Sequence, residues 1–224
     1  MISWFITLSS IIEVVEAAVA LFVSFYALRF YSLAREGLFM ALFISFLVLG
    51  LGLLCHGAAT GLLLMLAPRL RTAVFVLGMR AFAFMLSACE VFAYGLLAYS
   101  YTRYGAPGRR KSDGAASLSF PAISLMAGNP LRQEALIGLV RFHPLLEGLV
   151  LAVLAYLAFR TVSNFLSEKE VNPFLVGFSF LFLTASRVCF VLAFSLALLY
   201  ITAHVLQLLA FLSLLMVLLR VVRT

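Results

Sequence analysis

The chain has 224 residues, of which 65% are hydrophobic and 11% charged, and its formal net charge is +7. A soluble domain has roughly 45–50% apolar and about 25% charged residues, so this composition excludes a soluble globule and predicts that lipid is the main solvent. The bases mostly stand singly at the ends of apolar segments, a pattern of helix-end anchors rather than of a nucleic-acid surface.

Apolar runs of about 20 residues or more, long enough to cross a membrane, predict six transmembrane helices. Their ranges are 4–28, 37–66, 72–101, 135–162, 172–200 and 203–221. The predicted fold class is therefore an all-α integral membrane protein of six helices. We divide it into a first three-helix half over 1–102, a linker over 103–134 and a second three-helix half over 135–224.

The linker is rich in proline and glycine, as expected of a connecting segment. Its middle, residues 117–126, is apolar but too short to cross hydrocarbon as a regular helix. We interpret it as an interfacial or re-entrant piece. The alternative is a seventh transmembrane helix.

The two halves share a faint internal repeat. Among the residues that match in one register without a gap are Glu13 with Glu147, Glu36 with Glu170, Ser45–Leu47 with Ser179–Leu181, and Cys55 with Cys189. If each half has three helices, an odd number, the second half enters the bilayer upside down, which is the plan of many transporters. The third and sixth predicted helices match poorly, and this argues against a true duplication.

The arginine and lysine residues of the predicted six-helix arrangement give little information on its orientation in the membrane. With the N-terminus outside, the cytoplasmic loops hold Arg29, Arg35, Arg103, Arg109, Arg110, Lys111 and Arg132. With the N-terminus inside, they hold Arg69, Arg71, Arg160, Lys169, Arg220 and Arg223. The positive-inside rule favours the first choice only slightly.

Glutamates inside the predicted helices are the main candidates for function. Glu13 and Glu16 are three residues apart and share one helix face. An ionised carboxylate within a membrane costs at least ~2.5 kcal/mol, and two close carboxylates cannot both ionise cheaply. We interpret Glu13, Glu16, Glu147 and Glu90 as candidate ion- or proton-coupling residues.

Three arginines are candidate counter-charges for these acids: Arg80, Arg187 and Arg141. The plainer alternative is that acids and arginines form interhelical ion pairs that only hold the bundle together. Glu147 follows Pro144, which predicts either a broken helix with a carboxylate at the break or a helix that begins near Pro144.

No enzyme signature is present: the chain lacks GxSxG, HExxH and Walker motifs. The sequence thus favours a protein that is not an enzyme, and no catalytic residue, metal site or cofactor is predicted. His143 and His204 begin two predicted helices on the same membrane side and form a candidate haem-ligand pair. Interfacial histidine is the plainer interpretation.

We interpret the chain as a prokaryotic, multi-pass protein of the cell membrane that transports or conducts a small cation or protons. The alternative function is a non-catalytic membrane subunit, anchor or sensor of a larger complex, and a haem-binding redox subunit is the third. The predicted partners are the lipid bilayer, a small cation or proton, and further membrane subunits or copies of this chain. No nucleic acid is predicted.

Overall fold

The computed structural model describes residues 2–69, 72–104, 144–168, 171–193 and 197–223. The long helices are α1 (Ile2–Ala34), α2 (Gly37–Leu66), α3 (Thr72–Tyr104), α5 (Pro144–Glu168), α6 (Val171–Leu192) and α7 (Ala197–Arg223), and a short 3-10 turn, η1 (Ala67–Arg69), follows α2. All six long helices have the length and apolar composition needed to cross a membrane. This confirms the predicted all-α membrane fold and makes the chain a multi-pass membrane protein.

The connection between the last two predicted helices is misplaced, and α1 and α5 each end six residues later than predicted. The fifth and sixth helices were expected to meet near residues 200–203, but α6 ends at Leu192 and α7 begins at Ala197. The sequence between them is apolar and contains neither proline nor glycine, so hydropathy carries no signal for the break. Residues 105–143 lie outside the described residues, and they include most of the predicted linker, its interfacial piece with the seventh-helix alternative, and the start of the predicted fourth helix.

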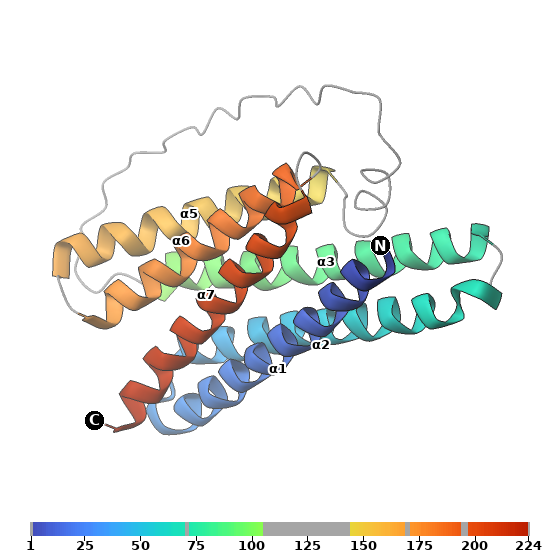
Figure 1. Ribbon diagram of the computed structural model, residues 1–224. Coiled ribbons are helices and arrows are strands. Elements are labelled where there is room, and N and C mark those ends of the chain that lie inside the picture. The colour runs from blue at the N-terminus through green and yellow to red at the C-terminus, as the bar shows by residue number, and fades with distance from the viewer. Residues whose placement is uncertain (1, 70–71, 105–143, 169–170, 194–196, 224) are drawn as a thin grey trace.

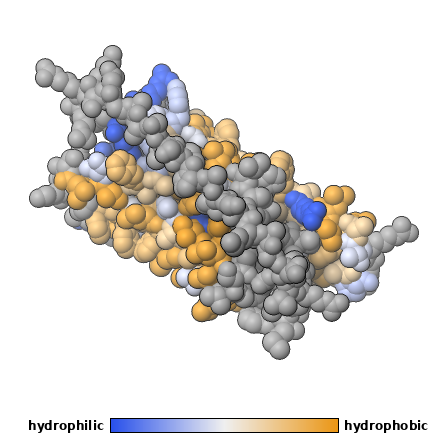
Figure 2. Space-filling view, turned by 90° about the horizontal axis from the view of Figure 1, so that it is seen from above, coloured by the Kyte–Doolittle hydropathy of each residue, from blue (hydrophilic) through white to orange (hydrophobic). Residues whose placement is uncertain are grey.

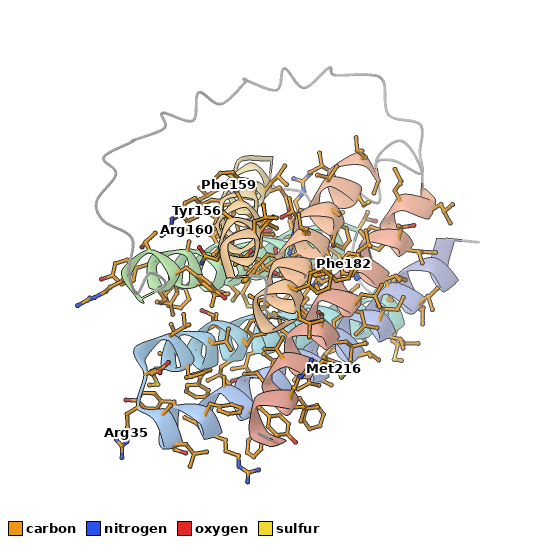
Figure 3. All side chains as sticks on the ribbon, turned by 90° about the vertical axis from the view of Figure 1, so that its left-hand side faces the viewer. Arg35, Tyr156, Phe159, Arg160, Phe182 and Met216 are labelled. Atoms are coloured by element: carbon orange, nitrogen blue, oxygen red, sulfur yellow. The ribbon has the colours of Figure 1, made fainter. Side chains whose placement is uncertain are left out.

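The outside of the bundle is apolar. Figure 2 shows hydrophobic residues over most of the described surface of one face, with hydrophilic residues gathered toward its ends. Large apolar side chains point away from the helices, among them Phe159 and Met216, which are 75% and 63% exposed (Figure 3). An exposed apolar surface of this extent is unfavourable in water and suits contact with lipid.

The six helices pack in a closed ring in the order α1, α2, α3, α5, α6, α7 and back to α1. Two aromatic pairs connect helices that are not neighbours in this ring. Phe46 of α2 meets Phe211 of α7 edge to face, with centroids 5.6 Å apart, and Phe180 of α6 meets Tyr101 of α3 at 5.8 Å. Phe46 and Phe180 are matched in the repeat, so the halves are arranged alike, as a duplication would produce. The duplication itself stays a prediction.

The relative direction of the helices does not confirm an inverted repeat. Helices α1 and α7 are parallel, because Ser9 lies beside Tyr200 and Glu16 beside Gln207. In Figure 1, α1, α3, α5 and α7 all run from right to left, and α2 and α6 run back. The inversion was expected from counting three helices in each half, but α3 ends and α5 begins at opposite ends of the bundle.

Helices α1 and α2 approach each other closely at Gly57. A Cβ atom there would lie 3.1 Å from the carbonyl oxygen of Ser10 and 3.2 Å from Cβ of Glu13. Small residues permit this kind of close helix packing in membranes. The same contact brings Glu13 of α1 against His56, the residue that precedes Gly57 in α2.

The helix directions predict the sidedness of three exposed positions. We expect cysteines placed at Arg35 and Arg220 to react with a membrane-impermeant thiol reagent from one side of the membrane, and a cysteine at Pro68 from the other. The native Cys55, Cys89 and Cys189 are first replaced by serine. Six strictly alternating spans would instead place Arg220 on the side of Pro68, and that labelling pattern would contradict the structure.

A second prediction concerns the α1–α2 contact. The substitution Gly57→Ala should lower the midpoint of thermal unfolding in detergent, because α1 has to move away by a few tenths of an ångström. The matched control is Gly95→Ala, where a Cβ meets no atom within 4 Å. Alanine is favoured over glycine in a helix by roughly 0.5–1 kcal/mol, so the control should be neutral or stabilising. Equal stabilisation by both substitutions would argue against tight packing at Gly57.

Candidate functional site

A cluster of buried polar side chains lies between α1, α2 and α7. We call it the carboxylate–histidine cluster, and its members are Glu13, Glu16, His56, His204 and Gln207. Each of these residues is at most 1% exposed. Glu13 and Glu16 both lie on the buried face of α1, as their spacing predicts, and α2 and α7 supply the imidazole and amide groups that face them.

The members of this cluster form a continuous chain of polar contacts. Nδ1 of His56 lies 2.6 Å from Oε2 of Glu13, and Nε2 of His204 lies 3.9 Å from Oε1 of the same carboxylate. The other ring nitrogen of His204, Nδ1, lies 3.0 Å from Oε1 of Glu16. The amide of Gln207 donates to Oε2 of Glu16 at 3.2 Å. Each carboxylate therefore has an imidazole partner, and His204 lies between the two.

The chain of contacts continues toward the N-terminal end of α1. The hydroxyl oxygen of Ser9 lies 2.8 Å from that of Tyr200 and 3.5 Å from Nε2 of His204. Ser9 is 6% and Tyr200 3% exposed. Hydroxyl groups can both donate and accept hydrogen bonds, so these two residues extend the cluster with groups able to pass a proton.

A second buried group joins α3, α5 and α6. We call it the arginine triad: Arg187 donates to Glu90 through Nη2, and its Nη1 lies 3.4 Å from Oε2 of Glu147. Arg187 and Glu90 are completely buried. A buried guanidinium is tolerated only when carboxylates compensate for the lost hydration, and here two acids from two other helices do so.

Phe190 lies between the two groups and contacts both. Its ring packs edge to face on the imidazole of His204, with centroids 4.9 Å apart, and Cζ of Arg187 lies 5.6 Å from its centroid. The ring also contacts Tyr200 at 5.5 Å. One aromatic side chain thus connects the carboxylate–histidine cluster to the arginine triad. It places Glu13 and Glu147, which are matched in the repeat, in neighbouring buried groups.

Among the residues that the structure describes, the charges of the carboxylate–histidine cluster balance only when protons are bound. Two carboxylates with two neutral imidazoles carry a net charge of −2, and the cluster becomes neutral when it holds two additional protons. An uncompensated charge in a low-dielectric interior is strongly unfavourable. Counting described residues alone, the arginine triad has two carboxylates for one guanidinium, so it balances with one proton. Buried acids and imidazoles in this proportion can bind and exchange protons.

The four acids expected from the sequence lie in two groups, one with histidines that were not predicted as partners and one with Arg187, a predicted counter-charge. Glu13 and Glu16 face histidines, whereas Glu90 and Glu147 share Arg187. Arg80 is exposed on α3 and, within the described part of the chain, takes part in no ion pair with these acids. Arg141 lies outside the described residues. Residues 135–143, which directly precede Pro144, also lie outside the described residues. Whether the helix is broken near Glu147 therefore stays a prediction.

His56, Gln207, Ser9 and Tyr200 were missed as site residues. Among the histidines, only His143 and His204 were considered, because they begin two predicted helices. A usable signal was present in the hairpin formed by α1 and α2. Glu13 and His56 lie at nearly equal distances along the chain from the turn at Arg35 and Glu36, so an antiparallel pair of helices places them at the same depth.

The haem hypothesis is not supported by this geometry. His143 lies outside the described residues, and both ring nitrogens of His204 have polar neighbours, Ser9 and Glu16. An iron ligand needs one ring nitrogen directed at the metal. Across the described ranges, His, Cys, Asp and Glu side chains form no group of three that could hold a metal ion.

Comparisons with protein-family models, with curated proteins and with solved structures find no match for this chain. The carboxylate–histidine cluster and the arginine triad are therefore the basis of the proposed function.

The arginine triad predicts a large difference between two arginines. Replacing Arg187 with methionine leaves two buried carboxylates without their cation, which should destabilise the protein by roughly 3–5 kcal/mol. Arg80→Met, at an exposed position, is the matched control and should change stability by at most about 0.5 kcal/mol. Unfolding in detergent measures both.

The triple variant Arg187→Met, Glu90→Gln, Glu147→Gln separates the electrostatic effect from lost packing. It removes all three charges and should recover part of the stability that Arg187→Met loses. Equal stability of the two single variants would show that Arg187 is not held as described.

Proposed function

We propose that this protein is a proton-coupled membrane transport protein in which the carboxylate–histidine cluster takes up and releases the coupling protons. The proposal is carried by one observation, the unbroken series of contacts from His56 through Glu13 and His204 to Glu16 inside the membrane-spanning bundle. Chains of acidic and histidine residues within membranes are typical of proton relays in pumps and transporters.

The chemistry of the cluster favours protons over metal or alkali cations. Imidazole changes its charge near neutral pH, and each carboxylate here lies against an imidazole rather than a ring of oxygen ligands. Hard cations such as Mg²⁺ and Ca²⁺ prefer six or more oxygens. A proton needs only one acceptor, and the cluster offers four titratable side chains in contact with one another.

The arginine triad is proposed to provide a permanent counter-charge beside the proton site. Arg187 holds Glu90 more closely than Glu147, whose carboxylate oxygen lies 3.4 Å away. Glu147 is therefore the better candidate of the two for a carboxylate that changes partner or protonation during transport. Phe190, which touches both Arg187 and His204, supports coupling between the two groups.

The alternative function, a membrane subunit or sensor of a larger complex, also has an observation in its favour. An arginine bound by acids from two other helices holds three helices together, and this is what a purely structural ion pair would do. Copurification of a second protein or of further copies of this chain would favour this alternative over an autonomous transporter.

The proposed function predicts proton movement that depends on Glu13. In proteoliposomes that contain an internal pH dye, a K⁺ diffusion potential should drive proton entry, and Glu13→Gln should reduce the rate at least roughly tenfold, because glutamine cannot bind a proton. Glu36→Gln is the matched control, since Glu36 is exposed in the connection between α1 and α2. It should leave the rate unchanged.

Two results would count against this function. One is a rate in Glu13→Gln equal to that of the wild type. The other is a wild-type rate equal to that of protein-free vesicles, with no change in proton binding between wild type and Glu13→Gln in a direct titration of the purified protein.

A further inference from the structure

We infer that the carboxylate–histidine cluster exchanges protons with one side of the membrane only, the side at which α1, α3, α5 and α7 begin, and that this side is extracytoplasmic. The inference deepens the proposed function and rests on it. It assigns the direction from which the coupling proton enters in the state described here.

The depth of the cluster is the first argument. Glu13 lies 11 residues from Ile2, where α1 begins, and 21 residues from its end at Ala34. At 1.5 Å per residue these separations are roughly 16 Å and roughly 31 Å. His204 is likewise close to the beginning of α7 and far from its end. The cluster is therefore nearer to one end of the bundle.

Several buried polar side chains lie on the short way out, beside the apolar residues Ala193 and Ala203. Between the cluster and the beginnings of α1 and α7 lie the buried side chains of Ser9, Ser10, Thr60 and Tyr200. Ser9 contacts both Tyr200 and His204. Hydroxyl groups in contact with an imidazole can relay a proton, and waters can bridge such groups when they are polar enough.

The long way out is closed by apolar packing. The described core of α1, α2 and α7 on that side consists of apolar residues that are at most 6% exposed: Ala17, Ala20, Val23, Ala27, Phe30, Phe46, Leu49, Leu53, Ala210, Phe211, Leu214 and Leu218. Phe46 and Phe211 meet edge to face at its centre, and both are completely buried. The buried polar exceptions on these helices are Ser24, which donates to the carbonyl oxygen of Phe43, and Ser45.

No further charge faces the cluster from the described parts of the helices packed around it. Its titratable members come from α1 (Glu13, Glu16), α2 (His56) and α7 (His204, with Tyr200 beside it). Helix α6 presents Phe190, and Arg187 lies beyond that ring. Proton exchange thus has a polar route toward one end of the bundle and an apolar barrier toward the other.

The distribution of bases identifies the two sides. Because α1, α3, α5 and α7 share one direction, the bases near their C-terminal ends gather at one end of the bundle: Arg29, Arg35, Arg103, Arg160 and Arg220. Figure 3 looks onto this end, with Arg35 and Arg160 labelled. The positive-inside rule makes it the cytoplasmic side. The balance of bases found from the sequence depended on assuming strictly alternating helices in an inverted repeat.

The test uses the full chain in proteoliposomes of one orientation, selected by a tag added after Thr224. Infrared difference spectra record the carboxyl bands while the pH is changed on one side of the vesicle at a time, and Glu13→Gln and Glu16→Gln assign the bands. We expect the bands to follow the pH on the side of Pro68. Exchange from the side of Arg35 should be at least roughly tenfold slower, because charge has to cross the apolar core.

The outcomes separate the inference from the proposed function. Bands that follow pH equally from both sides, or faster from the side of Arg35, overturn one-sided access and leave proton binding intact. Bands that respond from neither side overturn both. In the expected case, Phe46→Ala should speed exchange from the side of Arg35, whereas Phe180→Ala, at the matched position in the second half, should not.

Discussion

The arrangement of this protein depends on one constraint: carboxylates that lie inside a membrane-spanning bundle have to be neutralised by groups from other helices. Four buried glutamates, Glu13, Glu16, Glu90 and Glu147, meet one guanidinium and two imidazoles. Each of these contacts joins different helices, so satisfying the charges also decides which helices pack together. Within the described parts of the chain these acids outnumber the permanent cations beside them, which is compatible with proton binding, so the structural and the proposed functional roles have one physical origin.

The positions that match in the predicted repeat have different chemistry in the ring of six helices. The first helix of each half carries a buried glutamate at the matched position, and the first helix of each half packs against the third helix of the other. Glu13 meets histidines, whereas Glu147 meets Arg187. A histidine can gain or lose a proton near neutral pH and an arginine cannot. The proposed proton exchange therefore lies around Glu13, between α1, α2 and α7, and permanent charge compensation lies around Glu147, between α3, α5 and α6.

Much of the fold follows from local properties of the sequence, and the site follows only in part. Long apolar runs between bases predict the helices, because crossing hydrocarbon requires both length and internally paired backbone groups. The cost of a charge in a membrane identified Glu13, Glu16, Glu90, Glu147 and Arg187 as unusual. The partners of these residues could not be derived in the same way, since they depend on which helices touch and in which direction each one runs.

By itself, the sequence determined the class of protein and the acids that need compensation, because hydropathy and charge are properties of single segments. Only the tertiary structure decided that α1 and α7 are parallel, that His56 and His204 share Glu13, and that Arg80 stays outside. Helix direction in the second half depends on how the chain passes from α3 to α5. An apolar sequence with few charges contains no local pattern that specifies the direction of these helices. Packing and charge compensation between helices select that direction.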